Sequence, residues 1–100
     1  MKLRWTHEAL ERLMEIEAFI SIDSPERAKK FVDEIIEHAE KTLPDRTRLG
    51  RVVPEISNPN IRELLFKKYR IVYRLNKNNV EILTVFEGHR LLRIDEIERK

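Results

Sequence analysis

Apolar residues recur at helical spacing near the start of the chain. From residue 7 onward the apolar positions of this stripe are Ala9, Leu13, Ile16 and Ile20, with Leu10 and Phe19 widening it. This spacing predicts an amphipathic helix. Thr6 precedes the stripe and is a residue type that caps a helix N-terminus. The segment before it, residues 2–5, is only long enough for a short strand.

A second helix is predicted after a short break. Ser24, Pro25 and Glu26 form a strong helix start, because Ser caps free N–H groups, Pro is tolerated in the first turn and Glu complements the helix dipole. The apolar positions that follow are Ala28, Phe31, Val32, Ile35, Ile36, Ala39 and Leu43. They repeat with the helical period, and Pro44 marks the end. The short link between the two helices predicts an antiparallel hairpin.

The rest of the chain predicts a sheet. Residues 45–60 are rich in turn formers and are expected to cross as a loop from the helices to the strands. Three strands are then predicted at residues 61–66, 69–75 and 80–86, with a polar turn at 76–79. Strands joined by such short connections pair antiparallel.

The strand at 69–75 has two different faces. With the period of two, Ile71, Tyr73 and Leu75 point one way, whereas Arg70, Val72 and Arg74 point the other. We expect the apolar row to pack on the helical hairpin. The residues predicted to be buried together are Leu13, Phe31, Ile35, Ile71 and Tyr73. The arginine row is expected to lie on an open, concave and positively charged face.

Length and composition limit the possibilities. A chain of 100 residues has apolar surface for one core, which predicts a single domain over residues 1–100. It has no Cys, and its three His are far apart in sequence, so we expect no metal and no cofactor. No apolar run resembles a signal peptide or a membrane span, which predicts a cytoplasmic protein with no membrane partner.

Charge is divided unevenly along the chain. Residues 1–45 hold 7 Lys and Arg against 11 Asp and Glu, whereas residues 46–100 hold 13 against 7. The basic half would suit phosphates or an acidic partner, and an ordinary solvated surface is the alternative. Residues 91–97 fit either a short helix or an irregular tail.

Six short segments, taken in order, resemble one known family. They are Trp5-Thr6-His7-Glu8-Ala9, Ser24-Pro25 with Ala28, Gly50-Arg51-Val52-Val53-Pro54-Glu55, Ile61-Arg62-Glu63-Leu64, Tyr69-Arg70-Ile71-Val72-Tyr73-Arg74 and Gly88-His89-Arg90. Their order and spacing resemble the RelE/ParE toxin superfamily over nearly the whole chain. The resemblance implies an α+β fold in which an N-terminal strand and a two-helix antiparallel hairpin pack on a three- to four-stranded antiparallel sheet.

The resemblance also implies a function. Members are toxin components of type II toxin–antitoxin systems, known too as plasmid stabilisation proteins, and a cognate antitoxin binds them in hetero-oligomers. RelE-like members are mRNA interferases that cleave mRNA on the ribosome without a metal, and ParE-like members inhibit DNA gyrase. The first hypothesis is a metal-independent endoribonuclease acting on ribosome and mRNA. The alternative is a non-catalytic gyrase inhibitor or an inactive relative that binds only its antitoxin.

Metal-free RNA cleavage needs a group that takes the 2′-OH proton, cations for the phosphorane and a group that protonates the leaving oxygen. The resemblance places these catalytic roles on Glu55, Arg70 and either His89 or Arg90. The residues that would bind the nucleic-acid phosphates are Arg62, Lys67, Lys68 and Arg74.

Each assignment has a structural alternative. Glu55 would then pair with Arg51 or Arg62, and Arg70 would hold a tail carboxylate such as Asp95 or Glu96. His89 would be a surface residue, and Lys67-Lys68 a solvated turn. RelE-like nucleases often end with a catalytic or stacking tyrosine, whereas this chain has no aromatic residue after Phe86. A general RNA-binding domain is disfavoured, because aromatic residues are not interleaved with the basic ones.

Overall fold

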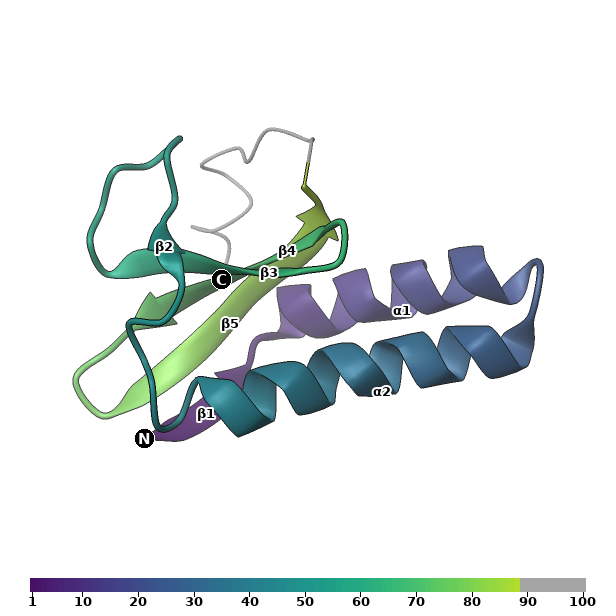
Figure 1. The fold of residues 1–100 in the computed structure, drawn as a ribbon, viewed down its shortest axis with the longest axis horizontal. Coiled ribbons are helices and arrows are strands. Elements are labelled where there is room, and N and C mark those ends of the chain that lie inside the picture. Colours follow the sequence, from purple (N-terminus) through teal and green to yellow (C-terminus); the bar gives the residue numbers. More distant parts are fainter. Residues whose placement is uncertain (89–100) are drawn as a thin grey trace.

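Two long helices and a mixed sheet make up residues 1–88, the part of the chain that the structure, a computed structural model, describes. The elements in chain order are β1 (Lys2–Trp5), α1 (His7–Ser21), α2 (Pro25–Thr42), β2 (Arg51–Val52), β3 (Ile61–Phe66), β4 (Tyr69–Leu75) and β5 (Asn79–Glu87). The antiparallel helical hairpin lies on one face of the sheet (Figure 1). The predicted α+β class, both helices and the three long strands are confirmed.

Each helix begins at the capping residue that the sequence predicts. Thr6 Oγ1 accepts a hydrogen bond from the backbone N–H of Ala9 at 3.1 Å and donates one to the carbonyl of Ile82 at 2.7 Å, so the start of α1 is fixed to β5. Ser24 Oγ accepts from the backbone N–H of Arg27 at 3.2 Å at the start of α2. These side chains satisfy N–H groups that have no partner within a helix.

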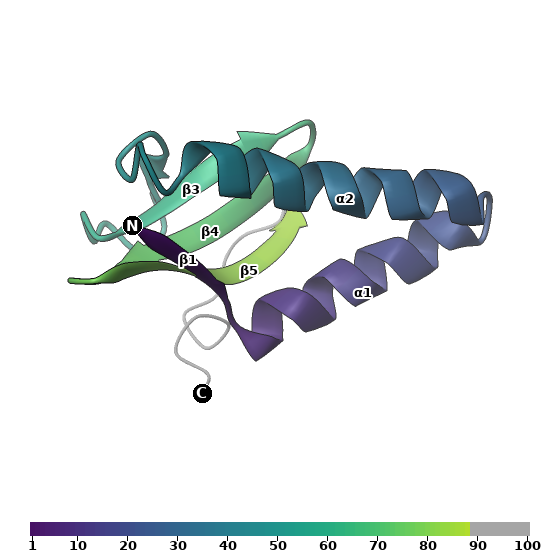
Figure 2. The same ribbon diagram turned by 90° about the horizontal axis from the view of Figure 1, so that it is seen from below.

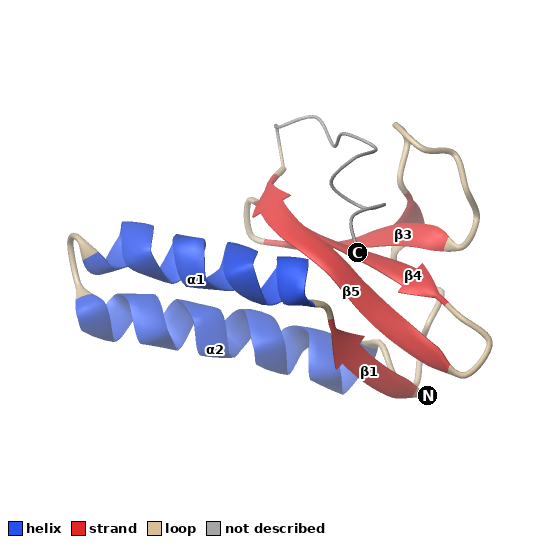
Figure 3. Cartoon of the chain, turned by 180° about the vertical axis from the view of Figure 1, so that it is seen from behind, coloured by secondary structure: helices blue, strands red, loops and turns tan. Residues whose placement is uncertain are grey.

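The sheet has more strands than expected among the described residues. Its order is β1-β5-β4-β3-β2, with β1 parallel to β5 and the remaining neighbours antiparallel (Figure 3). The expected three- to four-stranded antiparallel sheet is therefore corrected to a five-stranded mixed one. Local patterns miss β2 because two residues show no alternation, and they miss the β1–β5 pairing because it joins distant parts of the chain.

The core under the hairpin matches the predicted register. Leu13, Ile35, Ile71 and Tyr73 belong to one buried cluster, and Phe31 packs against it while partly buried. The strand period therefore assigns the faces of β4 correctly. By contrast, Leu10 and Phe19 do not widen the buried stripe of α1, because their side chains are 45% and 71% exposed.

A second apolar cluster lies on the opposite face of the sheet. Val53, Ile61, Val72, Leu83 and Phe86 are buried there, with Ile56 packed against them. Val53 and Ile56 come from the segment between β2 and β3, which folds over this face. The sheet is thus covered on both sides, and the expectation of an open basic face is wrong.

Candidate functional site

Arg70 lies on β4 at the centre of an ion-pair cluster that is only partly buried. Its side chain donates from Nε to Glu63 Oε1 at 2.5 Å, and from Nη1 and Nη2 to the two oxygens of Glu55 at 2.9 and 2.8 Å. Arg70 is only 3% exposed, and its guanidinium carbon lies 5.0 Å from the centre of the Phe86 ring. Paired contacts of this kind hold a guanidinium in a fixed orientation.

Glu63 extends the cluster across β3 to β2. Its second oxygen accepts from Arg51 Nε at 2.5 Å, and the residue is 1% exposed. The cluster therefore runs Arg51, Glu63, Arg70, Glu55, with cations and carboxylates alternating. The buried charges of Glu63 and Arg70 compensate each other, and the more exposed Arg51 and Glu55 complete the pairing, which is how a protein tolerates ionised groups in its interior.

The electrostatics of Arg70 follow from these contacts. The hydrogen bond to Glu55 is the main cause that raises the pKa of Arg70, burial opposes it, and Glu63 raises it further. Arg70 therefore stays a fixed cation at every physiological pH. It could meet a phosphate only if Glu55 moved away from it.

The structure brings together some of the predicted site residues. Arg70 and Glu55 are in direct contact. The structural alternative, in which Glu55 pairs with Arg51 or Arg62, is wrong. His89 and Arg90 lie outside the described residues. The same holds for the expected tail partners of Arg70, Asp95 and Glu96.

The four predicted phosphate-binding residues do not converge. Arg62 donates to the carbonyls of Gly50 and Pro59 at 3.0 and 2.9 Å. Arg74 lies 3.9 Å from Glu81, which also accepts from Arg4 at 2.6 Å.

Lys67 and Lys68 sit elsewhere, at the turn between β3 and β4. Lys67 points toward α2, where its Nζ lies 3.5 Å from Glu34.

Glu63 is the functional candidate that the sequence reasoning missed. A signal was present, because Glu63 follows Ile61 at the period of a strand and so shares its face. A carboxylate on the inner face of a strand next to an arginine-bearing strand indicates a cross-strand ion pair. The pattern of β4 instead predicts that this face is open to solvent, where a lone carboxylate carries no signal.

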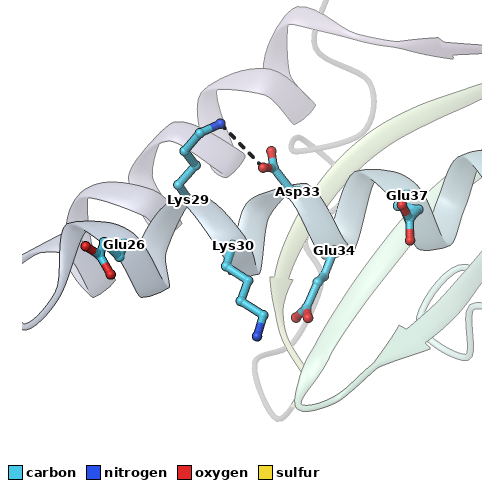
Figure 4. A pocket seen from close by; sticks show the side chains of 6 residues that line it. All are labelled: Glu26, Lys29, Lys30, Asp33, Glu34 and Glu37. Atoms are coloured by element: carbon cyan, nitrogen blue, oxygen red, sulfur yellow. Dashed lines mark hydrogen bonds and ion pairs between the residues drawn. The ribbon is translucent and has the colours of Figure 1, made fainter.

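The exposed face of α2 carries a row of charged residues. Glu26, Lys29, Lys30, Asp33, Glu34 and Glu37 line a shallow depression there, and Lys29 lies 3.5 Å from Asp33 (Figure 4). All six come from one helix and carry both signs of charge, which is typical of a solvated helix surface. No helix within residues 1–88 is long and apolar enough to cross a membrane.

Comparisons with known proteins agree on one family. Residues 3–92 match the family model described as ParE toxin of the type II toxin–antitoxin system parDE. The chain is 38% identical over 92 residues to Y4kP of Sinorhizobium fredii, named as a candidate toxin, and the match covers 88% of both proteins. A chain in the structure of the chromosomal ParDE toxin–antitoxin system from P. aeruginosa is similar, with a TM-score of 0.72, 27% identity and coverage of 87% of this chain and 95% of that one. This chain therefore belongs to the ParE toxin family, within the RelE/ParE toxins of type II toxin–antitoxin systems.

Proposed function

We propose that this toxin inhibits growth by binding a protein target, DNA gyrase, rather than by cleaving mRNA. The ion pair between Arg70 and Glu55 carries the proposal. A ribonuclease would use Arg70 to meet the phosphorane and Glu55 to take the 2′-OH proton. Here the two groups bind each other at 2.8 and 2.9 Å, so each occupies the contacts that the other would need for catalysis.

Two further observations support a binding role. Arg62, Lys67 and Arg74 hydrogen-bond or pair with partners of their own chain, on different sides of the sheet, so they form no single track for a nucleic-acid backbone. The matching family model is also that of ParE toxins, for which the resemblance implies gyrase as the target.

A cognate antitoxin is the second partner that we propose. The family model and the similar ParDE structure both belong to toxin–antitoxin pairs. Because Arg70 already donates to two carboxylates of its own chain, we do not expect antitoxin carboxylates to bind it. Co-expression with the gene encoded next to the toxin, followed by pull-down, tests this partnership.

Two assays in parallel test the target. Purified toxin would be added to DNA gyrase in a supercoiling assay, and to ribosomes translating a defined mRNA whose ends are mapped by primer extension. Loss of supercoiling with intact mRNA is the expected result. Cleaved mRNA with normal supercoiling would restore the ribonuclease hypothesis, and no effect in either assay would overturn both in favour of an inert relative.

A further inference from the structure

A cleft lies where the helical hairpin passes the turn between β3 and β4. The far halves of α1 and α2 project beyond this turn, away from the sheet (Figures 1 and 2). The cleft has a volume of about 420 Å³ and receives side chains from α1, from α2 and from the turn. It lies on the face of the sheet opposite the Arg70 cluster, because Tyr69, which lines it, and Arg70 point to opposite faces of β4.

The turn holds two lysines in a fixed place beside the helices. Lys67 has a φ of 54°, in the left-handed region that non-glycine residues seldom adopt. Its Nζ lies 5.4 Å from the centre of the Phe31 ring, 5.5 Å from that of Phe66 and 3.5 Å from Glu34. These contacts with α2 hold Lys67 in place, and Lys68, next to it in the turn, also lines the cleft.

Cations outnumber carboxylates in the cleft. Arg27, Lys30, Lys67 and Lys68 line it together with Asp23 and Glu34. Of the four cations only Lys67 forms an ion pair within residues 1–88. Arg27, Lys30 and Lys68 are exposed. Figure 4 shows Lys30 and Glu34 on one side of α2, with Lys29 and Asp33 turned to the other.

The cleft also has an apolar wall. Phe19 is 71% exposed, although it is a large aromatic side chain, and Ile20 and Phe31 lie beside it, partly buried. Protein interfaces are enriched in aromatic side chains and in Arg, because a ring supplies buried area, and cations beside it select an acidic partner.

We propose that this cleft docks an acidic peptide segment of a protein partner, with one large apolar side chain against Phe19 and carboxylates at Arg27, Lys30 and Lys68. The proposal rests on the proposed function, because the partner is the protein that the toxin inhibits. A nucleic acid fits less well. The Phe31 and Tyr69 rings pack 5.4 Å apart and Lys67 lies over Phe31, so among the rings that line the cleft only Phe19 is open enough to stack on a base.

The test uses a fluorescein-labelled peptide in which glutamates flank a central Leu-Phe pair, titrated against the full chain by fluorescence anisotropy. We expect binding that weakens about tenfold or more in the double variant Lys30→Glu/Lys68→Glu and in Phe19→Ser. The controls are Lys77→Glu, an exposed lysine in the turn between β4 and β5, and Met14→Ser, 66% exposed on α1. Circular dichroism would verify that every variant is folded.

Several outcomes would overturn the docking site. These are no binding, equal binding of a peptide with glutamine in place of glutamate, equal weakening by the control variants, or displacement of the peptide by a single-stranded oligonucleotide at lower concentration. The gyrase assay separates the two proposals. If the wild type binds the peptide but does not inhibit gyrase, the proposal of gyrase as the target is wrong and the docking site stands. If the wild type does not bind the peptide and the double variant still inhibits gyrase, gyrase stays the proposed target and the docking site is wrong.

Discussion

Glu63 holds together the polar cluster on the covered face of the sheet. Each of its oxygens accepts from a different arginine, Arg51 on β2 and Arg70 on β4. A carboxylate that is 1% exposed loses nearly all of its hydration, so its charge is tolerated only because both cations are present. Arg70 then links Glu63 to Glu55. The cluster therefore joins three strands and the covering segment.

Arg70→Ala is expected to destabilise the fold. It removes the cation that lies between two carboxylates and leaves Glu63 buried with one partner, a change that typically lowers the free energy of unfolding by about 3–5 kcal/mol. Urea denaturation followed by circular dichroism measures the loss. Arg74→Ala is the matched control, because Arg74 is more exposed and its nearest carboxylate atom is 3.9 Å away, so a loss below about 1 kcal/mol is expected. Equal, small losses in both variants would show that the Arg70 cluster is not structural.

The expected instability of Arg70→Ala affects how a loss of toxicity in this variant is interpreted. The strand period alone places Arg70 on the face opposite Ile71, and a side chain on an open face can be truncated at little cost in stability. The burial of Arg70 reverses that expectation. Any loss of toxicity in Arg70→Ala must therefore be compared with the amount of folded protein before a role in activity is assigned.

Gly50 is required by close packing. Its N–H donates to the Tyr73 hydroxyl at 2.9 Å, and that hydroxyl donates to the carbonyl of Thr47 at 2.9 Å. A Cβ at this position would lie 2.7 Å from the hydroxyl oxygen and against the backbone carbonyl of Glu63. The sequence predicts a turn former here, but its packing partners come from β3 and β4 and no local pattern reveals them.

Gly50→Ala is expected to lower the free energy of unfolding by about 1–3 kcal/mol, because the loop must shift away from β3. Thermal melting measures the effect. Gly88→Ala is the comparison, since a Cβ there approaches the nearest backbone atom only to 3.2 Å and needs a smaller adjustment. A larger loss at Gly88 than at Gly50 would contradict this account.

At the scale of elements, the sequence predicts those with a regular pattern. Both helices and β3, β4 and β5 follow from period and caps, since each buries one continuous stripe or row. The segment between β2 and β3 does not, because Val53 and Ile56 are isolated apolar residues among turn formers. Their burial depends on the shape of the sheet beneath them, which is why the candidate site was expected to be open.

Strand β4 makes a prediction about alkaline pH. The chain has two tyrosines, and both lie on the hairpin face of β4. Burial is the main cause that raises the pKa of each above 10.0, aided at Tyr69 by Glu87 and opposed at Tyr73 by the Gly50 N–H. A raised pKa in the folded state stabilises the fold below pH 10 and loses this effect as pH rises through the raised values.

Absorbance at 295 nm and circular dichroism, recorded together during an alkaline titration, test this. Both tyrosines should ionise above pH 10, together with unfolding. Ionisation with a midpoint at the ordinary value while the circular dichroism stays native would show that the phenols are accessible. Tyr69→Phe should halve the absorbance change and leave the coincidence with unfolding intact.

At the scale of the whole molecule, charge and apolar surface are arranged differently from their order in the sequence. The basic second half of the chain does not build one basic surface. Arg51 and Arg70 are used in the ion-pair cluster, and Arg62 holds loop carbonyls. Conversely, the cleft beside the hairpin gathers cations and rings from α1, α2, the β3–β4 turn and the start of β4. A search of the sequence for interleaved basic and aromatic residues misses such a site, because these residues are distant in sequence and only the fold brings them together.

The two apolar clusters also predict how stability is distributed. Strand β4 lies in the middle of the sheet order, hydrogen-bonded on both edges, with the hairpin cluster on one face and the Val53 cluster on the other. Its amides, with those of Ile82 and Val85 on β5, should exchange with solvent only through global unfolding.

At the projecting end of the hairpin, Phe19 and Ile22 are exposed and the helices extend beyond the sheet, so local opening there needs no disruption of either cluster (Figure 2). Native-state hydrogen exchange by NMR should therefore find Ile71, Val72 and Tyr73 among the slowest amides and residues 19–23 among the fastest of those in or next to the helices. The destabilising variant Arg70→Ala should speed the β4 amides and leave the hairpin end nearly unchanged. If the hairpin end were as protected as β4, the helices and the sheet would unfold only together, and the projecting cleft would be as rigid as the core.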